Sequence, residues 1–147
     1  MRNKVVRILL VDDDEITNFL SKEVLQLHFA EAEIITVTNG EEALEFLADQ
    51  LKGESALPQI MLLDINMPLM NGWEFLEKLE EGNQQEYSSI NIFMYTSSVY
   101  FEDLNKAKRN RLLKNILTKP LNDEGIQEMI ASVNTENVNR RDAGQLN

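Results

Sequence analysis

The chain has 147 residues, of which 43% are hydrophobic and 27% are charged, so it is long enough to bury the core of one domain. Acidic residues outnumber basic ones by 25 to 14, and the net charge of −11 disfavours nucleic acid and anionic membranes as partners. Because cysteine is absent and no apolar run reaches the length of a membrane span, we expect a cytoplasmic protein without disulfides or thiolate chemistry.

Short apolar runs alternate along the chain with segments in which apolar residues recur at three- and four-residue spacing. The runs predict strands at residues 5–11, 33–38, 59–63, 90–96 and 114–118. The spaced segments predict helices that begin after Asp14, after Asn39, at Trp73, at Tyr100 and before Ile126. Since right-handed crossovers place helices on both faces of a parallel sheet, the alternation predicts one doubly wound α/β domain.

Some segments carry more specific expectations. Residues 82–89 are expected to form a polar connection, and residues 100–112 a helix with a weak apolar stripe. We expect the domain to cover residues 1–137 and residues 138–147 to form a polar tail. The first helix has a clear apolar stripe, made of Ile16, Phe19, Leu20, Val24 and Leu27.

Polar residues that suit one another chemically stand where the predicted strands end. They are Asp12, Asp13 and Asp14 after the first strand, Asp64 after the third, Thr96 at the end of the fourth and Lys119 after the fifth. Ligands of open α/β sheets bind at the carboxyl ends of the strands, so we expect these side chains to meet at one edge.

This set has the parts of a phosphoryl-transfer site. Clustered carboxylates repel one another and need a cation or raised pKa values, and Mg²⁺ prefers carboxylate oxygens. A carboxylate such as Asp64 can attack phosphorus to form an acyl phosphate. The metal, the ammonium of Lys119 and the hydroxyl of Thr96 would then meet the charge on the phosphoryl oxygens.

Each of these residues also has a simpler interpretation. An Asp after a strand is commonly a helix cap, which would suit Asp14. The Lys119-Pro120 pair is commonly only a turn, and Thr96 only a strand residue. The combination of all these residues at strand ends, in this order, favours the functional interpretation.

Four motifs make the sequence resemble the receiver domain of two-component response regulators. They are Ile-Leu-Leu-Val-Asp-Asp-Asp (8–14), Met-Leu-Leu-Asp-Ile-Asn-Met-Pro-Leu-Met-Asn-Gly (61–72), Tyr-Thr-Ser-Ser (95–98) and Leu-Thr-Lys-Pro-Leu (117–121). The resemblance covers roughly residues 5 to 135, nearly the whole chain. It implies a flavodoxin-like, five-stranded parallel sheet of order 2-1-3-4-5 with five helices.

The resemblance also implies a metal site. Asp64 stands at the position of the phosphoacceptor, and Asp12 and Asp13 match the acidic pair that holds Mg²⁺, with Asp13 as the direct ligand. Asn66, two residues past Asp64, would lend its backbone carbonyl to the metal.

Further roles follow from the resemblance on the other side of the site. Thr96 matches the hydroxyl that follows the phosphoryl group, and Ser97 fills the next position, where small residues leave room for it. Lys119 matches the lysine that pairs with the phosphoryl oxygens, and Pro120 would follow a cis peptide bond.

One position departs from the family pattern. Ile116 stands three residues before Lys119, where the family often has Tyr or Phe as a rotameric switch coupled to the threonine. An aliphatic side chain cannot make the same movement. We therefore hypothesise that the helix after the fourth strand and its preceding loop (Val99, Tyr100 and Phe101) report the phosphorylation state.

The resemblance implies a stand-alone signalling switch that catalyses only its own phosphorylation and dephosphorylation. Its phosphoryl donor would be a sensor histidine kinase or a histidine phosphotransfer protein. Because we expect no output domain after the last helix, the output would be contact with a downstream protein or onward transfer. A homodimer through the face of the helix after the fourth strand is a further hypothesis.

Two other functions stay open at this point. A receiver-shaped domain can serve as a passive docking module, although the complete set of acidic residues, Thr96 and Lys119 argues against degeneracy. A phosphatase with an aspartyl nucleophile, as in the haloacid dehalogenase-like group, is the second alternative. Asp64-Ile65-Asn66 imitates that group only loosely, and the chain has no room for a cap domain.

Overall fold

The strands at the centre of the molecule are short and almost wholly apolar. The computed structural model describes residues 6–53, 56–82 and 84–133. Its central strands, β1 (Arg7–Val11) and β3 (Ile60–Leu63), are buried along nearly their whole length, because each pairs with a strand on both sides. β4 (Asn91–Thr96) is also paired on both sides, and the edge strands are β2 (Glu33–Val37) and β5 (Leu113–Thr118).

The five strands form one parallel sheet in the order β2-β1-β3-β4-β5. This order confirms the doubly wound topology expected from the resemblance. The order reverses between β1 and β3, so the carboxyl ends of these two strands lie side by side at the point where such sheets bind ligands.

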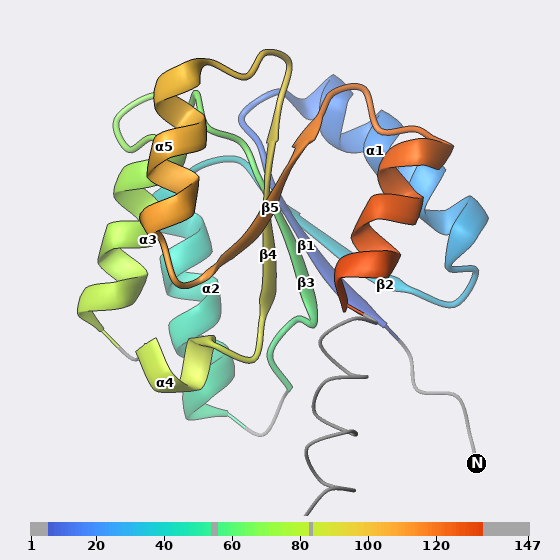
Figure 1. The fold of residues 1–147 in the computed structure, drawn as a ribbon. Coiled ribbons are helices and arrows are strands. Elements are labelled where there is room, and N and C mark those ends of the chain that lie inside the picture. Colours follow the sequence, from blue (N-terminus) through green and yellow to red (C-terminus); the bar gives the residue numbers. More distant parts are fainter. Residues whose placement is uncertain (1–5, 54–55, 83, 134–147) are drawn as a thin grey trace, which may run out of the picture.

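Helices cover both faces of the sheet (Figure 1). On one face lie α1 (Glu15–His28) and a helix over residues 123–133. On the other face lie α2 (Gly40–Lys52), α3 (Gly72–Glu81) and α5 (Phe101–Arg109). Each face has its own apolar cluster, one centred on Phe75 and Leu76 and the other on Leu25 and Phe93.

Asx side chains begin three of the helices. Asp14 Oδ1 accepts hydrogen bonds from the backbone N–H of Ile16 at 3.0 Å and of Thr17 at 3.4 Å. Hydrogen bonds from Thr17 hold the pKa of Asp14 below its usual range. Asn39 and Asn71 cap α2 and α3 in the same way. The simpler interpretation of Asp14 as a helix cap is therefore confirmed.

Most of the apolar stripe of the first helix does not face the sheet, contrary to the usual expectation for an amphipathic helix, although Val24 packs against the core. Ile16, Phe19 and Leu27 are 70%, 61% and 83% exposed. The buried residues of α1 are instead Asn18, Ser21 and Leu25. Leu25 packs in the apolar cluster of this face of the sheet, and Asn18 and Ser21 make polar contacts that are described below.

Two expectations about connections need correction. Residues 82–89 are not only a polar connection, because they contain the short helix α4 (Gln84–Tyr87). The helix expected over 100–112 ends at Arg109, where Asn110 turns the chain and its side chain accepts from the backbone N–H of Leu112 and Leu113. The expected tail at 138–147 and the residue Val5 lie outside the described residues.

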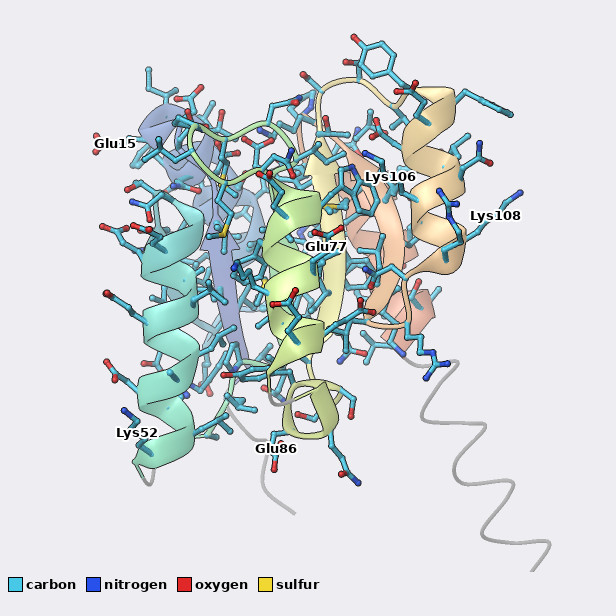
Figure 2. The ribbon with its side chains drawn as sticks, turned by 90° about the vertical axis from the view of Figure 1, so that its left-hand side faces the viewer. Glu15, Lys52, Glu77, Glu86, Lys106 and Lys108 are labelled. Carbon is cyan, nitrogen blue, oxygen red and sulfur yellow. The ribbon has the colours of Figure 1, made fainter. Side chains whose placement is uncertain are left out.

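Charged side chains cover the outer surface of the helical layer in Figure 2, which labels Glu77, Glu86 and Lys108 among them. Within the described residues, every helix is too short or too polar to cross a bilayer. The acidic composition is thus carried by the solvent-facing sides of the helices rather than by the core.

Candidate functional site

Three carboxylates gather at the carboxyl ends of β1 and β3. Asp12 and Asp13 directly follow β1, and Asp64 directly follows β3. The ladder holds these ends together, since the Asp64 N–H donates to the Val11 carbonyl at 2.9 Å. One carboxylate oxygen from each of the three residues lies within 4.8 Å of the other two, a spacing that could hold a metal ion.

The three carboxylates differ in their exposure to solvent. Asp12 and Asp64 are buried, whereas Asp13 is exposed. Burial raises the pKa of Asp64 to about 6, the negative charge of Asp12 raises it as well, and the positive charge of Lys119 acts in the opposite direction. A divalent cation would remove the repulsion that raises this pKa, so the donor set fits a hard cation.

Lys119 lies between two of the carboxylates. Its Nζ is 2.6 Å from Asp12 Oδ2 and 3.5 Å from Asp64 Oδ1. Burial alone would lower the pKa of Lys119, but the hydrogen bond and charge of Asp12, followed by those of Asp64, outweigh it and leave the pKa raised. The lysine is therefore held as an ammonium ion at the acidic edge.

The backbone after Lys119 has the form expected from the sequence. The Lys119–Pro120 peptide bond is cis, and the Lys119 N–H donates to the Thr96 carbonyl at 2.7 Å. This bond ties the end of β5 to the end of β4, and so brings the lysine and the threonine to the same edge of the sheet as Asp64.

Thr96, Ser97 and Asn66 surround this group at the ends of β4 and β3. Thr96 is buried, and its hydroxyl donates to the Ser98 carbonyl at 3.1 Å rather than to a carboxylate. Ser97 is exposed next to it. Asn66 is exposed, and its N–H donates to Asp64 Oδ1 at 3.3 Å.

The residues of the expected switch region lie at the end of β4 (Thr96), at the start of α5 (Tyr100 and Phe101) and on β5 (Ile116). Tyr100 and Phe101 are largely exposed, and Ile116 is only partly buried. Phe101, Leu104 and Ile116 line one shallow groove between α5 and β5. The aliphatic side chain of Ile116 therefore lies beside the exposed aromatic residue at the start of α5.

Two residues that the sequence did not single out hold the acidic loops in place. Asn18 is buried on α1, and its Nδ2 donates to the Asp12 carbonyl at 2.9 Å. Gly72 donates to the Ile65 carbonyl at 2.8 Å, and a Cβ at its position would lie 2.6 Å from the Asp64 carbonyl oxygen. The signal for Gly72 was present in the 61–72 motif, whereas nothing local distinguishes Asn18 from a surface residue.

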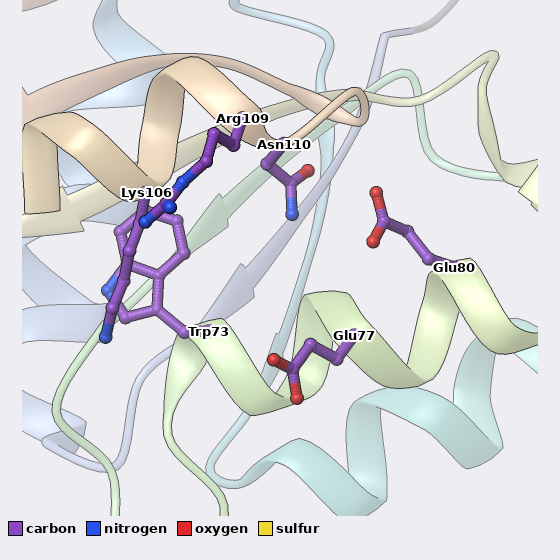
Figure 3. Close-up of a pocket in the computed structure, with 6 residues that line it drawn as sticks. All are labelled: Trp73, Glu77, Glu80, Lys106, Arg109 and Asn110. Carbon is purple, nitrogen blue, oxygen red and sulfur yellow. The ribbon is translucent and has the colours of Figure 1, made fainter.

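Trp73 joins α3 to α5 and lines the hollow in Figure 3. Its Nε1 donates to Asp103 Oδ1 at 3.1 Å, and the ammonium of Lys106 lies 5.8 Å from the centroid of the indole. Glu77 and Arg109 also line this hollow, in which opposite charges face each other. Trp73 is buried at 8% exposure and contacts α5 from its place on α3.

The sheet order and the acidic edge define a doubly wound α/β protein with a carboxylate cluster at its strand ends that could hold a metal ion. The family model of the response regulator receiver domain matches residues 8–131. The chain belongs to this family, whose members are phosphoacceptor signalling domains rather than enzymes in the ordinary sense.

Relatives of known name agree with this assignment. Response regulator Rcp1 of Synechocystis is 30% identical over 127 residues, covering 86% of this chain and 84% of Rcp1. The nitrate/nitrite response regulator NarL of Escherichia coli is 32% identical over 133 residues. That match covers 85% of this chain but 57% of NarL, so the chain spans little more than half of that relative.

Solved structures share the fold. A two-component response regulator from Cytophaga hutchinsonii matches with a TM-score of 0.82 and 28% identity, over 90% of this chain and 99% of that one. The Mn(2+)-bound form of Rcp1 matches with a TM-score of 0.65 and 29% identity, over 85% of this chain and 88% of that one.

Proposed function

We propose that the chain is a phosphoacceptor switch of a two-component or phosphorelay system, in which Asp64 takes the phosphoryl group with the help of bound Mg²⁺. The observation that carries this proposal is the placement of a buried carboxylate, Asp64, between an ammonium ion and two further carboxylates. An ordinary ion pair would need only the ammonium ion, and a helix cap would need neither the ammonium ion nor the other carboxylates. Neither role therefore explains the whole group.

The chemical step is an in-line transfer. An oxygen of the Asp64 carboxylate forms a bond to phosphorus while the bond from phosphorus to the imidazole nitrogen of a phosphohistidine breaks. The electron pair of that bond stays on the imidazole nitrogen. The donor would be a sensor histidine kinase or a histidine phosphotransfer protein, in keeping with the family.

Asp12, Asp13, Asp64 and the backbone carbonyl of Asn66 would hold the metal, which supplies positive charge next to the phosphoryl oxygens. The relative Rcp1 has been solved in a Mn(2+)-bound form, which supports a divalent cation as a ligand of this chain. The ammonium of Lys119 would meet another phosphoryl oxygen, since it already lies 3.5 Å from Asp64 Oδ1.

Output would follow from a movement of Thr96. Its hydroxyl is bound to the Ser98 carbonyl and is free to turn toward a phosphoryl group once that bond is released. Such a turn would pull on the loop before α5, where Tyr100 and Phe101 are exposed. We propose that a downstream protein or a second copy of the chain binds this face, and that the switch acts in the cytoplasm.

Acetyl phosphate can replace the protein donor in a direct test of the proposal. The purified chain is incubated with Mg²⁺ and acetyl phosphate, and its intact mass is compared with that of Asp64→Asn. We expect one added phosphoryl group in the parent only, and none after chelation of the metal. Absence of the adduct together with failure to bind beryllofluoride would favour a passive docking module, and steady release of phosphate from simple monoesters would favour a phosphatase.

A further inference from the structure

Tyr95 is the residue before Thr96 on β4, and its hydroxyl joins three separate parts of the chain. The side chain is 3% exposed and belongs to the apolar cluster under α1 and the helix over residues 123–133. Its Oη accepts a hydrogen bond from the Leu121 N–H at 2.9 Å. The same Oη lies 2.9 Å from Ser21 Oγ on α1, so one phenol connects β4, α1 and the turn after β5.

That turn is the segment that carries Lys119. The lysine is two residues before Leu121, and the ammonium of Lys119 lies 5.4 Å from the centroid of the Tyr95 ring. Tyr95 therefore contacts this segment twice, through a hydrogen bond behind the lysine and through its ring face toward the ammonium.

Apart from Tyr95, the turn is held near α1 by Leu121, which is buried in the same apolar cluster as Leu25, and His28 Nε2 on α1 lies 3.2 Å from Asp123 Oδ1 just after the turn. Leu20, Leu121 and the stem of Lys119 line a hollow between the helix and the turn, so side-chain packing there is incomplete. The turn also follows β5, which is an edge strand with a ladder on one side only. The Tyr95 hydroxyl and the bond from the Lys119 N–H to the Thr96 carbonyl thus anchor the backbone of this turn, in addition to the ion pairs that the Lys119 ammonium makes with Asp12 and Asp64.

We infer that Tyr95 is a positioning residue for phosphoryl transfer, because its hydroxyl fixes the turn that places the Lys119 ammonium beside Asp64. This inference rests on the proposed function of Asp64 and Lys119, and it adds a residue to that site. Tyr95 acts through Lys119 and does not touch the phosphoryl group. Removing only its hydroxyl is expected to leave the carboxylates in place and to loosen the ammonium.

Tyr95→Phe is the variant that tests the inference, and Ser21→Ala is its matched control. Both lose the bond between the Tyr95 hydroxyl and Ser21, but only Tyr95→Phe loses the bond to Leu121. We expect Tyr95→Phe to bind beryllofluoride roughly three- to tenfold more weakly in the presence of Mg²⁺, in line with the loss of the hydrogen bond to Leu121 that Ser21→Ala keeps. Its affinity for Mg²⁺ alone should not weaken, whereas general damage to the site would weaken both, and Ser21→Ala should match the parent.

A double-mutant cycle separates positioning from a merely structural role. In a Lys119→Met background, Tyr95→Phe should have no further effect on beryllofluoride affinity, because the ammonium that it positions is gone. Additive losses would overturn the inference, as would a Tyr95→Phe variant that is less stable but binds beryllofluoride like the parent.

Acylation of lysine side chains gives a readout that does not depend on phosphorylation. The rate at which an N-hydroxysuccinimide ester modifies Lys119 is measured by peptide mass spectrometry, with the exposed Lys52 as the internal reference. We expect faster modification of Lys119 in Tyr95→Phe than in the parent and in Ser21→Ala. An unchanged rate would contradict the inference, whether or not the parent takes a phosphoryl group. This experiment therefore separates failure of the inference about Tyr95 from failure of the proposed function.

Discussion

The ammonium of Lys119 lies 2.6 Å from Asp12 Oδ2, closer than its 3.5 Å separation from Asp64 Oδ1. The lysine therefore neutralises a carboxylate that is proposed to hold the metal, while it stays within reach of the proposed phosphoacceptor. Since one ammonium balances only part of the charge of three clustered carboxylates, the site keeps an excess of negative charge for a divalent cation.

This ion pair predicts opposite effects of one substitution on two measurements. Lys119→Met removes the positive charge and frees Asp12, so we expect Mg²⁺ to bind at least roughly threefold more tightly. The same variant should take the phosphoryl group from acetyl phosphate much more slowly, because a donor to the phosphoryl oxygens is lost. Metal titration by calorimetry and the rate of mass gain measure the two effects.

Lys52→Met is the matched control for this substitution. Lys52 is the last residue of α2, at the end of the helix far from the acidic edge (Figure 2). The Lys52→Met variant should leave both the affinity for Mg²⁺ and the rate of phosphorylation unchanged. Weaker binding of Mg²⁺ to Lys119→Met would show that the lysine does not compete with the metal.

The raised pKa of Asp64 predicts a dependence of stability on pH in the absence of metal. Between the ordinary value of 3.8 and the folded value of about 6, the folded protein binds more protons than the unfolded chain. The contribution of Asp64 to stability is therefore fully present below pH 3.8 and is lost as the pH rises through about 6.

Asp64→Asn should remove this loss. At pH 8 with a chelator present, we expect the variant to be more stable than the parent by about 1–3 kcal/mol, and near pH 4 we expect no difference. Urea unfolding at the two pH values measures the effect. A variant that is less stable than the parent at pH 8 would mean that Lys119 already neutralises Asp64 fully.

Gly72 predicts that the loop carrying Asp64 tolerates no side chain behind it. In Gly72→Ala the new Cβ would meet the Asp64 carbonyl oxygen at 2.6 Å and Ile65 Cα at 3.0 Å, and backbone atoms must shift to relieve the contact. We expect a loss of about 1–3 kcal/mol in unfolding free energy and slower phosphorylation.

Gly82→Ala provides the comparison, because the nearest atoms to its Cβ would lie at 3.7 and 3.9 Å. It lies at the other end of α3, and phosphorylation should stay at the parent rate. Equal rates in Gly72→Ala and the parent would show that the loop can move without harm to the site.

Because Ile116 stands where the family often has an aromatic switch residue, we expect activation to change the loop before α5 and α5 itself. Addition of Mg²⁺ and beryllofluoride should shift the amide resonances of residues 97–112, since the Thr96 hydroxyl must leave the Ser98 carbonyl. In Asp64→Asn these shifts should be absent. If the amides of residues 97–112 stayed unchanged in the parent, the readout through α5 would be wrong.

The sheet and the acidic edge could be predicted from the sequence because both depend on local patterns. Buried parallel strands appear as continuous apolar runs, and the residues after them are brought together by topology alone. Asp12, Asp64 and Lys119 therefore lie close together in the structure as expected, although they are far apart in the chain.

The orientation of α1 could not be predicted in this way. Its spacing of Ile16, Phe19 and Leu27 is helical, but those residues are exposed. The inward face of the helix carries the buried Leu25, the bond from Asn18 to the Asp12 carbonyl and the contact between Ser21 and the Tyr95 hydroxyl. Such contacts join polar residues from distant parts of the sequence and leave no periodic signal. For the same reason the sequence did not indicate Tyr95.

The most direct test of the central claim is the location of the phosphoryl group. After treatment with acetyl phosphate and Mg²⁺, reduction with borohydride converts a phosphorylated aspartate into homoserine, which peptide mass spectrometry can assign to one residue. We predict homoserine at position 64 and at neither Asp12 nor Asp13. Homoserine at Asp12 or Asp13, or an unmodified Asp64 in a chain that has gained a phosphoryl group, would contradict the account.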